Sequence, residues 1–209
     1  MPPSSVARLT LSQVSTRSIS GDPSAEFDAA ARALSAVRLR PEVRLTEVPA
    51  PSRIAPYSLA LTAEVLPTHN AEDEDELASG RFVLLHDPDG PEPWEGTWRI
   101  VTFVRAELEP ETATDPMLGA VGWSWLTDSL AAVGATYVAD AGTVTRVVSE
   151  SFAGLEERAP SVEMEVRASW TPTDNDLSIH LEAWGALLCT VAGLPPLPDG
   201  VVALPGQRR

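Results

Sequence analysis

Apolar residues recur at helical spacing in three segments of the chain. Asp22 and Pro23 precede the first segment, and this pair favours a helix start because aspartate caps the first turn and proline fits the first helical position. The same pair, Asp115 and Pro116, precedes the second segment. The third segment covers residues 177–192. The pattern therefore predicts three helices, each with one apolar face.

Six other segments have the two-residue alternation, or the β-branched and aromatic composition, that is typical of strands. They are residues 43–49, 57–66, 81–86, 97–108, 143–152 and 162–170. The fourth segment is the longest and carries apolar residues on both faces, which predicts a central strand that is covered on each side. The last two segments are joined by a connection with glycine and proline, so we expect them to pair as a hairpin.

The order of these elements is helix, four strands, helix, two strands, helix. Runs of strands with few interleaved helices predict an α+β fold with one mostly antiparallel sheet of about six strands and three helices packed on it. We expect residues 1–21 to be a flexible N-terminal segment, residues 22–204 to form a single α+β domain and residues 205–209 to be a flexible tail. The order is similar to that of the secretion-chaperone-like fold, a binding scaffold, although a fold does not carry function with it.

Charge narrows the possible partners. Thirty acidic residues against fifteen basic ones, all arginine, give a formal net charge of −15. Such a field repels phosphate backbones and anionic lipids, so we expect neither direct nucleic-acid binding nor membrane binding. Five consecutive acidic residues at positions 72–76 predict a solvated loop. The absence of lysine excludes a Schiff-base lysine and a P-loop lysine.

The cysteine content and the hydropathy of the chain indicate the cellular compartment of the protein. The single cysteine, Cys189, permits no internal disulfide and lies in an apolar run, so we expect an inert core thiol. The sequence contains no stretch of about 18 apolar residues, so it predicts no transmembrane helix. The first 20 residues lack the apolar centre of a secretory signal. Together these features predict a cytoplasmic protein.

Charged residues at alternating positions near the end of the fourth predicted strand are the first candidates for a catalytic or metal-binding role. Arg105, Glu107 and Glu109 lie two residues apart, so their side chains are expected to share a face. Glu107 and Glu109 could serve acid–base chemistry or bind a divalent metal. No histidine or further aspartate accompanies them at a metal-ligand spacing, which favours a salt-linked polar face. We therefore predict no metal site and no cofactor.

Four arginines on predicted strands are candidates for an anion-binding face. They are Arg99, Arg105, Arg146 and Arg167. Together they could hold a phosphate or a nucleotide. Glu163 and Glu165 lie on the predicted hairpin that also carries Arg146 and Arg167. Cross-strand pairs of opposite charge are therefore an alternative explanation for these arginines.

Two of the six tryptophans have no evident place in the core. Trp94 lies in a loop with two prolines, and Trp123 lies off the apolar stripe of its helix. Tryptophan supplies a large buried area with one polar group, so both are candidate anchors for a protein partner. Partial burial under a neighbouring loop is the alternative.

Five segments of the chain also resemble one known family. They are residues 38–61, 80–111, which include FVLLHDPDGPEPWEGTWRIVTF, 121–130, 142–155 and 180–204, which include HLEAWGALLCTVAGLPPLPDG. Together they are similar to the actinobacterial family called domain of unknown function three thousand. The resemblance covers about residues 24–204 and implies no activity, cofactor or catalytic residue. Members are often encoded near a ribonuclease-D-like protein, which implies a link to RNA metabolism.

Three functions remain open at this point. The first is a non-enzymatic protein-binding or regulatory domain, with a protein partner or as a homodimer. The second is an enzyme or ligand-binding domain for a small anion that uses the arginines and glutamates named above. The third is an acidic accessory factor in RNA processing that contacts a nuclease and not the RNA. The first is favoured because no nucleophile, metal or cofactor pattern outweighs its structural explanation.

Overall fold

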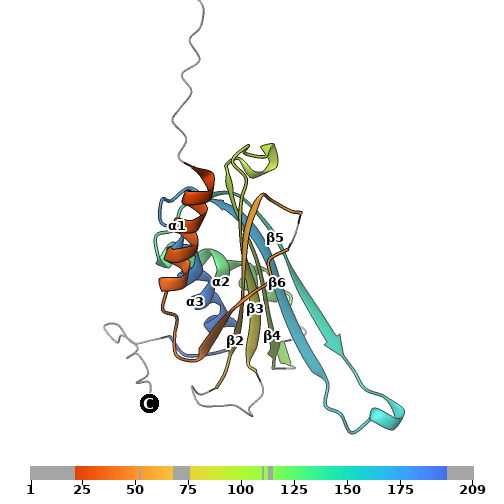
Figure 1. Cartoon of the computed structure of the whole chain (residues 1–209). Coiled ribbons are helices and arrows are strands. Elements are labelled where there is room, and N and C mark those ends of the chain that lie inside the picture. Colours follow the sequence, from red (N-terminus) through yellow and green to blue (C-terminus); the bar gives the residue numbers. More distant parts are fainter. Residues whose placement is uncertain (1–21, 52, 68–75, 110, 113–114, 197–209) are drawn as a thin grey trace, which may run out of the picture.

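The computed structural model describes residues 22–51, 53–67, 76–109, 111–112 and 115–196. Within them, one antiparallel sheet of six strands has the order β1-β2-β3-β4-β6-β5, and three helices lie on one of its faces (Figure 1). The elements are α1 (Pro23–Ala36), β1 (Val43–Val48), β2 (Tyr57–Val65), β3 (Ala78–His86), the 3-10 turn η1 (Glu92–Trp94), β4 (Trp98–Leu108), α2 (Leu118–Ala132), β5 (Tyr137–Ser149), the 3-10 turn η3 (Ala153–Leu155), β6 (Ser161–Pro172) and α3 (Ser178–Val191). The predicted fold class and the predicted order of elements are confirmed.

Local capping explains where the helices begin. Asp22 is the N-cap of α1, and its Oδ1 accepts a hydrogen bond from the Ser24 amide at 3.1 Å. At α2, Asp115 Oδ1 accepts from the Met117 amide at 2.8 Å, so this aspartate stabilises the turn that leads into the helix. Helix α2 therefore begins a few residues later than its cap pattern predicts, at Leu118.

The core lies between the helices and the sheet face that they cover. Its largest fully buried side chains include Phe82, Ile100, Trp170 and Trp184. Helix α3 packs closely on β3 because Gly80 has no side chain. A methyl group at position 80 would lie 2.8 Å from the Trp184 ring, well inside van der Waals contact.

The opposite sheet face, which we call the open face, differs from the prediction. The sequence pattern predicts that β4 is covered on both sides, but the helices cover only one. On the open face, Ala60, Val83 and Leu85 are buried at one end of the sheet, and the residues packed against them are Val48, Ala50, Ala55 and Trp94. Further along β4, Val101 is 38% exposed. The apolar open-face residues thus pack under a loop at one end and leave a partly exposed surface beside it.

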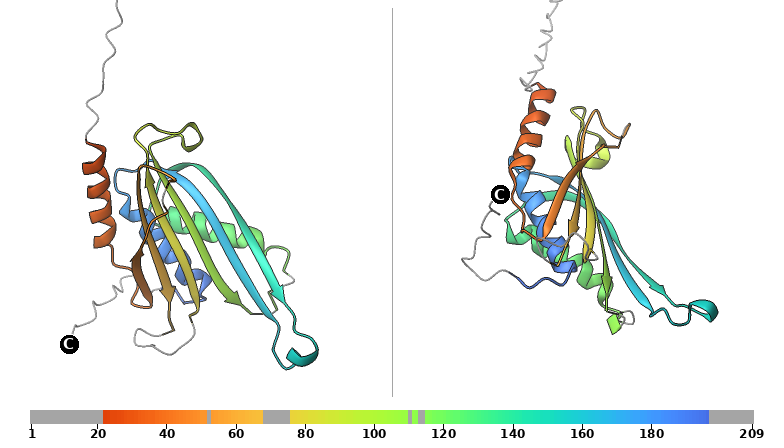
Figure 2. Two further views of the ribbon diagram at one scale, coloured as in Figure 1. Left: turned by 45° about the vertical axis from the view of Figure 1, so that its right-hand side comes forward. Right: turned by 60° about the horizontal axis from the view of Figure 1, so that its bottom comes forward.

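Strand β5 is longer than predicted and forms an edge of the sheet. It begins at Tyr137, and a bulge between Val138 and Ala141 shifts its pairing with β6. Ala139 in the bulge has φ 51°, a left-handed conformation that breaks the strand alternation. The predicted hairpin is confirmed, because β5 and β6 pair antiparallel as far as Ser149 and Ser161. Figure 2 shows the end of this hairpin extending beyond the other strands.

Some predictions fall outside the described residues. The N-terminal segment 1–21, most of the acidic loop and the C-terminal residues 197–209 are among them. Within the described part of the chain, no helix has both the length and the apolar character needed to span a membrane.

Candidate functional site

The sheet register places the candidate side chains of the open face in rows. Arg81, Phe103 and Arg167 are direct cross-strand neighbours on β3, β4 and β6. In the adjoining row Arg105 is opposite Glu165, and in the next Glu107 is opposite Glu163. The open face therefore carries an arginine–phenylalanine–arginine row beside a band of mixed charge.

Each arginine near the middle of this band is paired with a carboxylate. Arg105 Nη2 lies 2.6 Å from Glu163 Oε1, and Arg167 Nη2 lies 2.6 Å from Glu165 Oε2. The Arg167 guanidinium also lies over the Phe103 ring, with its central carbon 5.3 Å from the ring centroid. Exposed pairs of this kind contribute about 0–1 kcal/mol each, so they fix side-chain positions more than they stabilise the fold.

The two candidate catalytic glutamates are separated by the end of β4. Glu107 lies on the open face beside Glu163, whereas Glu109 follows the last residue of the strand and is exposed. Among the described residues, no group of three histidine, cysteine, aspartate or glutamate side chains could hold a metal ion. Arg105 thus lies among carboxylates, and the described residues give no convergent set of metal ligands.

Arg99 is also on the open face, but it is buried and held by the protein. Its side chain donates to the Ala139 carbonyl at 2.7 Å, to Ser169 Oγ at 2.6 Å and to Thr171 Oγ1 at 3.3 Å. The residue is 9% exposed, and burial lowers the pKa of its guanidinium while nearby Asp140 opposes the shift. Arg99 thus ties the bulge of β5 to β4 and β6.

Arg146 does not join the other three arginines. It is opposite Met164, whose side chain faces the helices, so Arg146 lies on the helix-covered side of the sheet. There its Nη1 donates to the Asp115 carbonyl at 2.6 Å, next to the start of α2. The expected face of four arginines is therefore wrong for Arg146, because strand alternation alone does not say which face a given arginine shares with residues on other strands.

The two candidate tryptophans are both partly buried. Trp94 packs against the cluster of Ala60, Val83 and Leu85, and its carbonyl accepts a hydrogen bond from the Thr171 hydroxyl. Trp123 packs from α2 onto β5 at Gly142, where a methyl group would lie 2.4 Å from the indole ring. Both indoles thus take part in internal packing.

A hollow of about 440 Å³ opens on the middle of the open face. Val83, Val101 and Phe103 contribute apolar surface, and Arg81 and Arg167 border it. The rest of the lining is Thr102 and a set of small residues on β5 and β6, which leave the space open; they are Ala141, Gly142, Thr143, Ala168 and Ser169.

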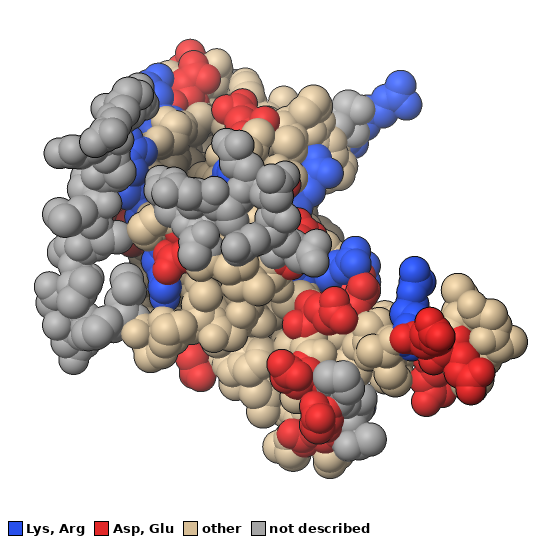
Figure 3. Space-filling model, turned by 90° about the horizontal axis from the view of Figure 1, so that it is seen from below, with Lys and Arg blue, Asp and Glu red and all other residues tan. Residues whose placement is uncertain are grey.

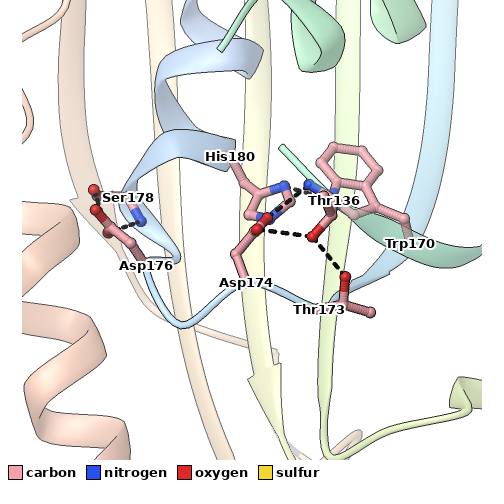
Figure 4. Close-up of polar contacts among 7 residues, drawn as sticks. All are labelled: Thr136, Trp170, Thr173, Asp174, Asp176, Ser178 and His180. Atoms are coloured by element: carbon pink, nitrogen blue, oxygen red, sulfur yellow. Dashed lines mark hydrogen bonds and ion pairs between the residues drawn. The ribbon is translucent and has the colours of Figure 1, made fainter. Parts of the chain in front are cut away.

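A buried polar network was not predicted from the sequence. The Trp170 indole N–H donates to His180 Nδ1 at 3.1 Å, and His180 Nε2 lies 3.1 Å from Asp174 Oδ2 (Figure 4). Indole is only a donor, so Nδ1 accepts and the proton of a neutral His180 is on Nε2, facing Asp174. Asp174 also accepts from the backbone amide and the hydroxyl of Thr136, each at 2.7 Å.

Burial and hydrogen bonding change the pKa values of His180 and Asp174 in this network. His180 is fully buried, which lowers its pKa, although Asp174 opposes the shift. Burial alone would raise the pKa of Asp174, but the hydrogen bonds from Thr136 and the contact with His180 together lower it. Both nitrogens of His180 are used within the protein, so the pair joins α3 to the ends of β5 and β6.

The single thiol is likewise enclosed. Cys189 is buried on α3, and burial raises its pKa to about 11. The reactive thiolate is therefore suppressed at neutral pH, as expected for an inert core thiol.

The end of the β5–β6 hairpin carries a different surface. We call residues 147–160, the end of β5 and the connection to β6, the arm. Of the eight large apolar residues that are exposed in the described chain, four lie on the arm. Phe152 and Leu155, at 74% and 58% exposure, are its most exposed members, and Val147 and Val148 are also exposed.

Comparison with models of known protein families identifies the family of this chain. A family model described as a protein of unknown function (DUF3000) matches residues 23–202. The chain belongs to the DUF3000 family. The match begins at the first residue of α1 and continues beyond α3, so the DUF3000 domain includes the whole sheet, the open face and the arm.

No curated protein and no solved structure matches this DUF3000 chain. Its similarity to the secretion-chaperone-like fold therefore rests on the order of elements alone. The arm was not among the candidate sites, because residues 143–152 were interpreted as a strand and residues 153–161 only as a connection. Two large apolar residues, Phe152 at the end of that predicted strand and Leu155 in the connection, stand between serine, glycine and glutamate and were the signal that could have identified it.

Proposed function

We propose that this DUF3000 protein is a non-enzymatic, cytoplasmic protein-binding domain whose arm docks into an apolar cleft of a partner protein. One observation carries the proposal: Phe152 and Leu155 are exposed in the connection between β5 and β6. Figure 2 shows that the end of this hairpin extends beyond the other strands. Large exposed apolar side chains that gather at one place are typical of interaction sites. Burying one such side chain fully contributes about 1.5–3 kcal/mol, so this pair can supply the centre of an interface.

Charge defines the chemistry of the partner. The segment 149–160 holds Glu150, Glu156 and Glu157 against one basic residue, Arg158. Figure 3 shows acidic side chains around the arm and on the neighbouring part of the molecule. A partner with a basic rim around its apolar cleft is complementary to this surface, and opposite potentials speed the encounter. A second copy of this chain would bring like charges together, so we favour a heterologous partner.

The positions of the chemically capable side chains support a binding role over catalysis. Arg99, Arg105 and Arg167 have hydrogen-bond or ion-pair partners within the protein. His180 is buried with both ring nitrogens used, and the thiol is buried. The RNA-processing alternative is compatible with this proposal if the basic partner is a nuclease, since the acidic chain itself would repel RNA.

Affinity capture from native lysate, followed by binding of the purified partner, tests the proposal. The test compares the wild-type chain with a Phe152→Ser/Leu155→Ser variant and with Ile54→Ser, which removes an exposed apolar residue far from the arm along the chain. We expect a basic protein to bind the wild type and the Ile54 variant alike. Loss of two apolar anchors should weaken its binding by about a hundredfold or more, because each 1.4 kcal/mol is a factor of ten.

The same comparison can refute the proposal. All three proteins should melt within about 2 °C of one another, because substitutions at exposed sites change stability little. Undiminished binding of the purified partner to the arm variant would show that the arm is not the docking site. Capture of only a second copy of this chain would contradict the heterologous partner.

A further inference from the structure

We propose that the hollow on the open face binds a small amphipathic monoanion, with a flat apolar body against Val101 and Phe103 and a carboxylate or similar head near Arg81 and Arg167. This site is separate from the arm and does not depend on the protein-binding function. It uses a surface that no catalytic or docking role above involves.

The shape of the hollow fits a small ligand. Its volume of about 440 Å³ lies within the range of small-molecule pockets, roughly 300–1,000 Å³. Val83, Val101, Ser169 and Ala141 form one row across four strands, and the side chains become small toward β5. This gradient makes the surface hollow where a row of large side chains would fill it. Phe103 stands in the next row, and its ring, over which the Arg167 guanidinium lies, contributes further apolar lining.

The arginines beside the hollow have the opposite sign of charge to the chain as a whole. Arg81 and Arg167 flank Phe103 on the two neighbouring strands, so their Cα atoms lie about 10 Å apart at the usual strand spacing. The chain carries a net charge of −15, and two guanidiniums beside an apolar surface are a local reversal of that field. An anion is therefore drawn to this part of the open face.

The existing contacts of these arginines limit the charge of the ligand. Arg167 is paired with Glu165 at 2.6 Å, and Arg81 Nη2 donates to the Pro49 carbonyl at 3.1 Å. The two arginines and Glu165 together carry one net positive charge, which matches a monoanion better than a nucleoside triphosphate. A guanidinium has five N–H donors, so contacts of this kind hold the group in place and leave donors for a ligand.

Apolar packing and charge can be tested separately with two fluorescent dyes. The first is 8-anilinonaphthalene-1-sulfonate, a monoanion, and the second is N-phenyl-1-naphthylamine, which has the same ring system without the sulfonate. We expect the wild-type chain to bind the anionic dye about tenfold more tightly than the neutral one, as one charge-assisted contact permits. Arg81→Gln and Arg167→Gln should each remove most of that preference and leave the affinity for the neutral dye unchanged. Ala141→Leu should weaken both dyes by filling the hollow.

Matched variants identify the site. Arg44→Gln removes an open-face arginine on the distant strand β1, which lies 3.8 Å from Glu64, and should leave both affinities unchanged. Phe152→Ser should also leave them unchanged if the dyes occupy the hollow and not the arm. The proposal is overturned if the wild type binds neither dye, if Arg81→Gln and Arg167→Gln retain the anionic preference, or if Ala141→Leu has no effect. Self-association that the dyes disperse would assign the open face to a second copy, and would also overturn it.

Discussion

Replacing Arg99 by methionine distinguishes a structural arginine from one that is poised for a ligand. Methionine keeps an unbranched apolar side chain but removes the guanidinium and its bonds to Ala139, Ser169 and Thr171. The Ala139 carbonyl belongs to a residue with φ 51°, so its hydrogen bond helps to hold the left-handed bulge of β5. We expect Arg99→Met to lower the free energy of unfolding.

The magnitude follows from the contacts. A hydrogen bond from a charged donor contributes about 1.5–3 kcal/mol, and two of the three bonds of Arg99 are short. The cost of burying the guanidinium, which lowers its pKa, offsets part of this gain. A net loss of about 2–4 kcal/mol remains, which corresponds to a melting temperature lower by roughly 4–16 °C for a chain of this size.

Arg105→Met is the matched control, because Arg105 lies on the same strand and face but is exposed. Its pair with Glu163 should contribute about 0–1 kcal/mol. Urea unfolding monitored by tryptophan fluorescence measures both variants. If the free energies of unfolding of Arg99→Met and Arg105→Met differ by less than about 1 kcal/mol, which is the uncertainty of such extrapolations, the structural role assigned to Arg99 is refuted.

Three other predictions follow from the core. Gly80→Ala should cost about 1–3 kcal/mol in urea unfolding through overpacking, whereas Gly119→Ala, where a methyl group meets nothing, should be neutral or slightly stabilising; equal effects would contradict the close packing of α3. The free energy of unfolding should fall as pH drops below about 6.5, because His180 in the unfolded chain takes up a proton that the buried residue resists. It should fall further below about 3.8, where Asp174, whose pKa is lowered in the folded protein, becomes protonated. In urea unfolding at a series of pH values, His180→Gln should reduce the first of these two losses, and an unchanged pH dependence would refute the role of His180. Cys189 should resist Ellman's reagent at pH 8 in the folded chain and react after urea unfolding; rapid labelling of the folded chain would show that the thiol is accessible.

The sequence predicts the parts of the fold that depend on local pattern. Asp22 and Pro23 begin α1 as expected, because capping is a contact between residues two or three positions apart. The alternation along β4 likewise divides its residues correctly between two faces. What covers each face is not a local property, so the open side of β4 was predicted to be covered.

The features that were missed depend on long-range register. A bulge at Ala139 interrupts the alternation of β5, so the strand was predicted to begin six residues late. Arg146 was grouped with the open-face arginines because its position opposite Met164 is set by the pairing of β5 with β6. The contact of Trp170 with His180 joins two elements through a turn whose geometry no periodicity describes. The candidate site was therefore predicted in its residue types and only partly in its arrangement.

Photo-crosslinking from the tip of the arm tests the central claim most directly. A photoreactive benzoylphenylalanine would replace Phe152, and in a control chain Ile54, in cells that produce the protein naturally. The account predicts a crosslink from position 152 to a basic partner protein and none to that protein from position 54. A crosslink from position 54 alone, or crosslinks from position 152 only to a second copy of this chain, would contradict it.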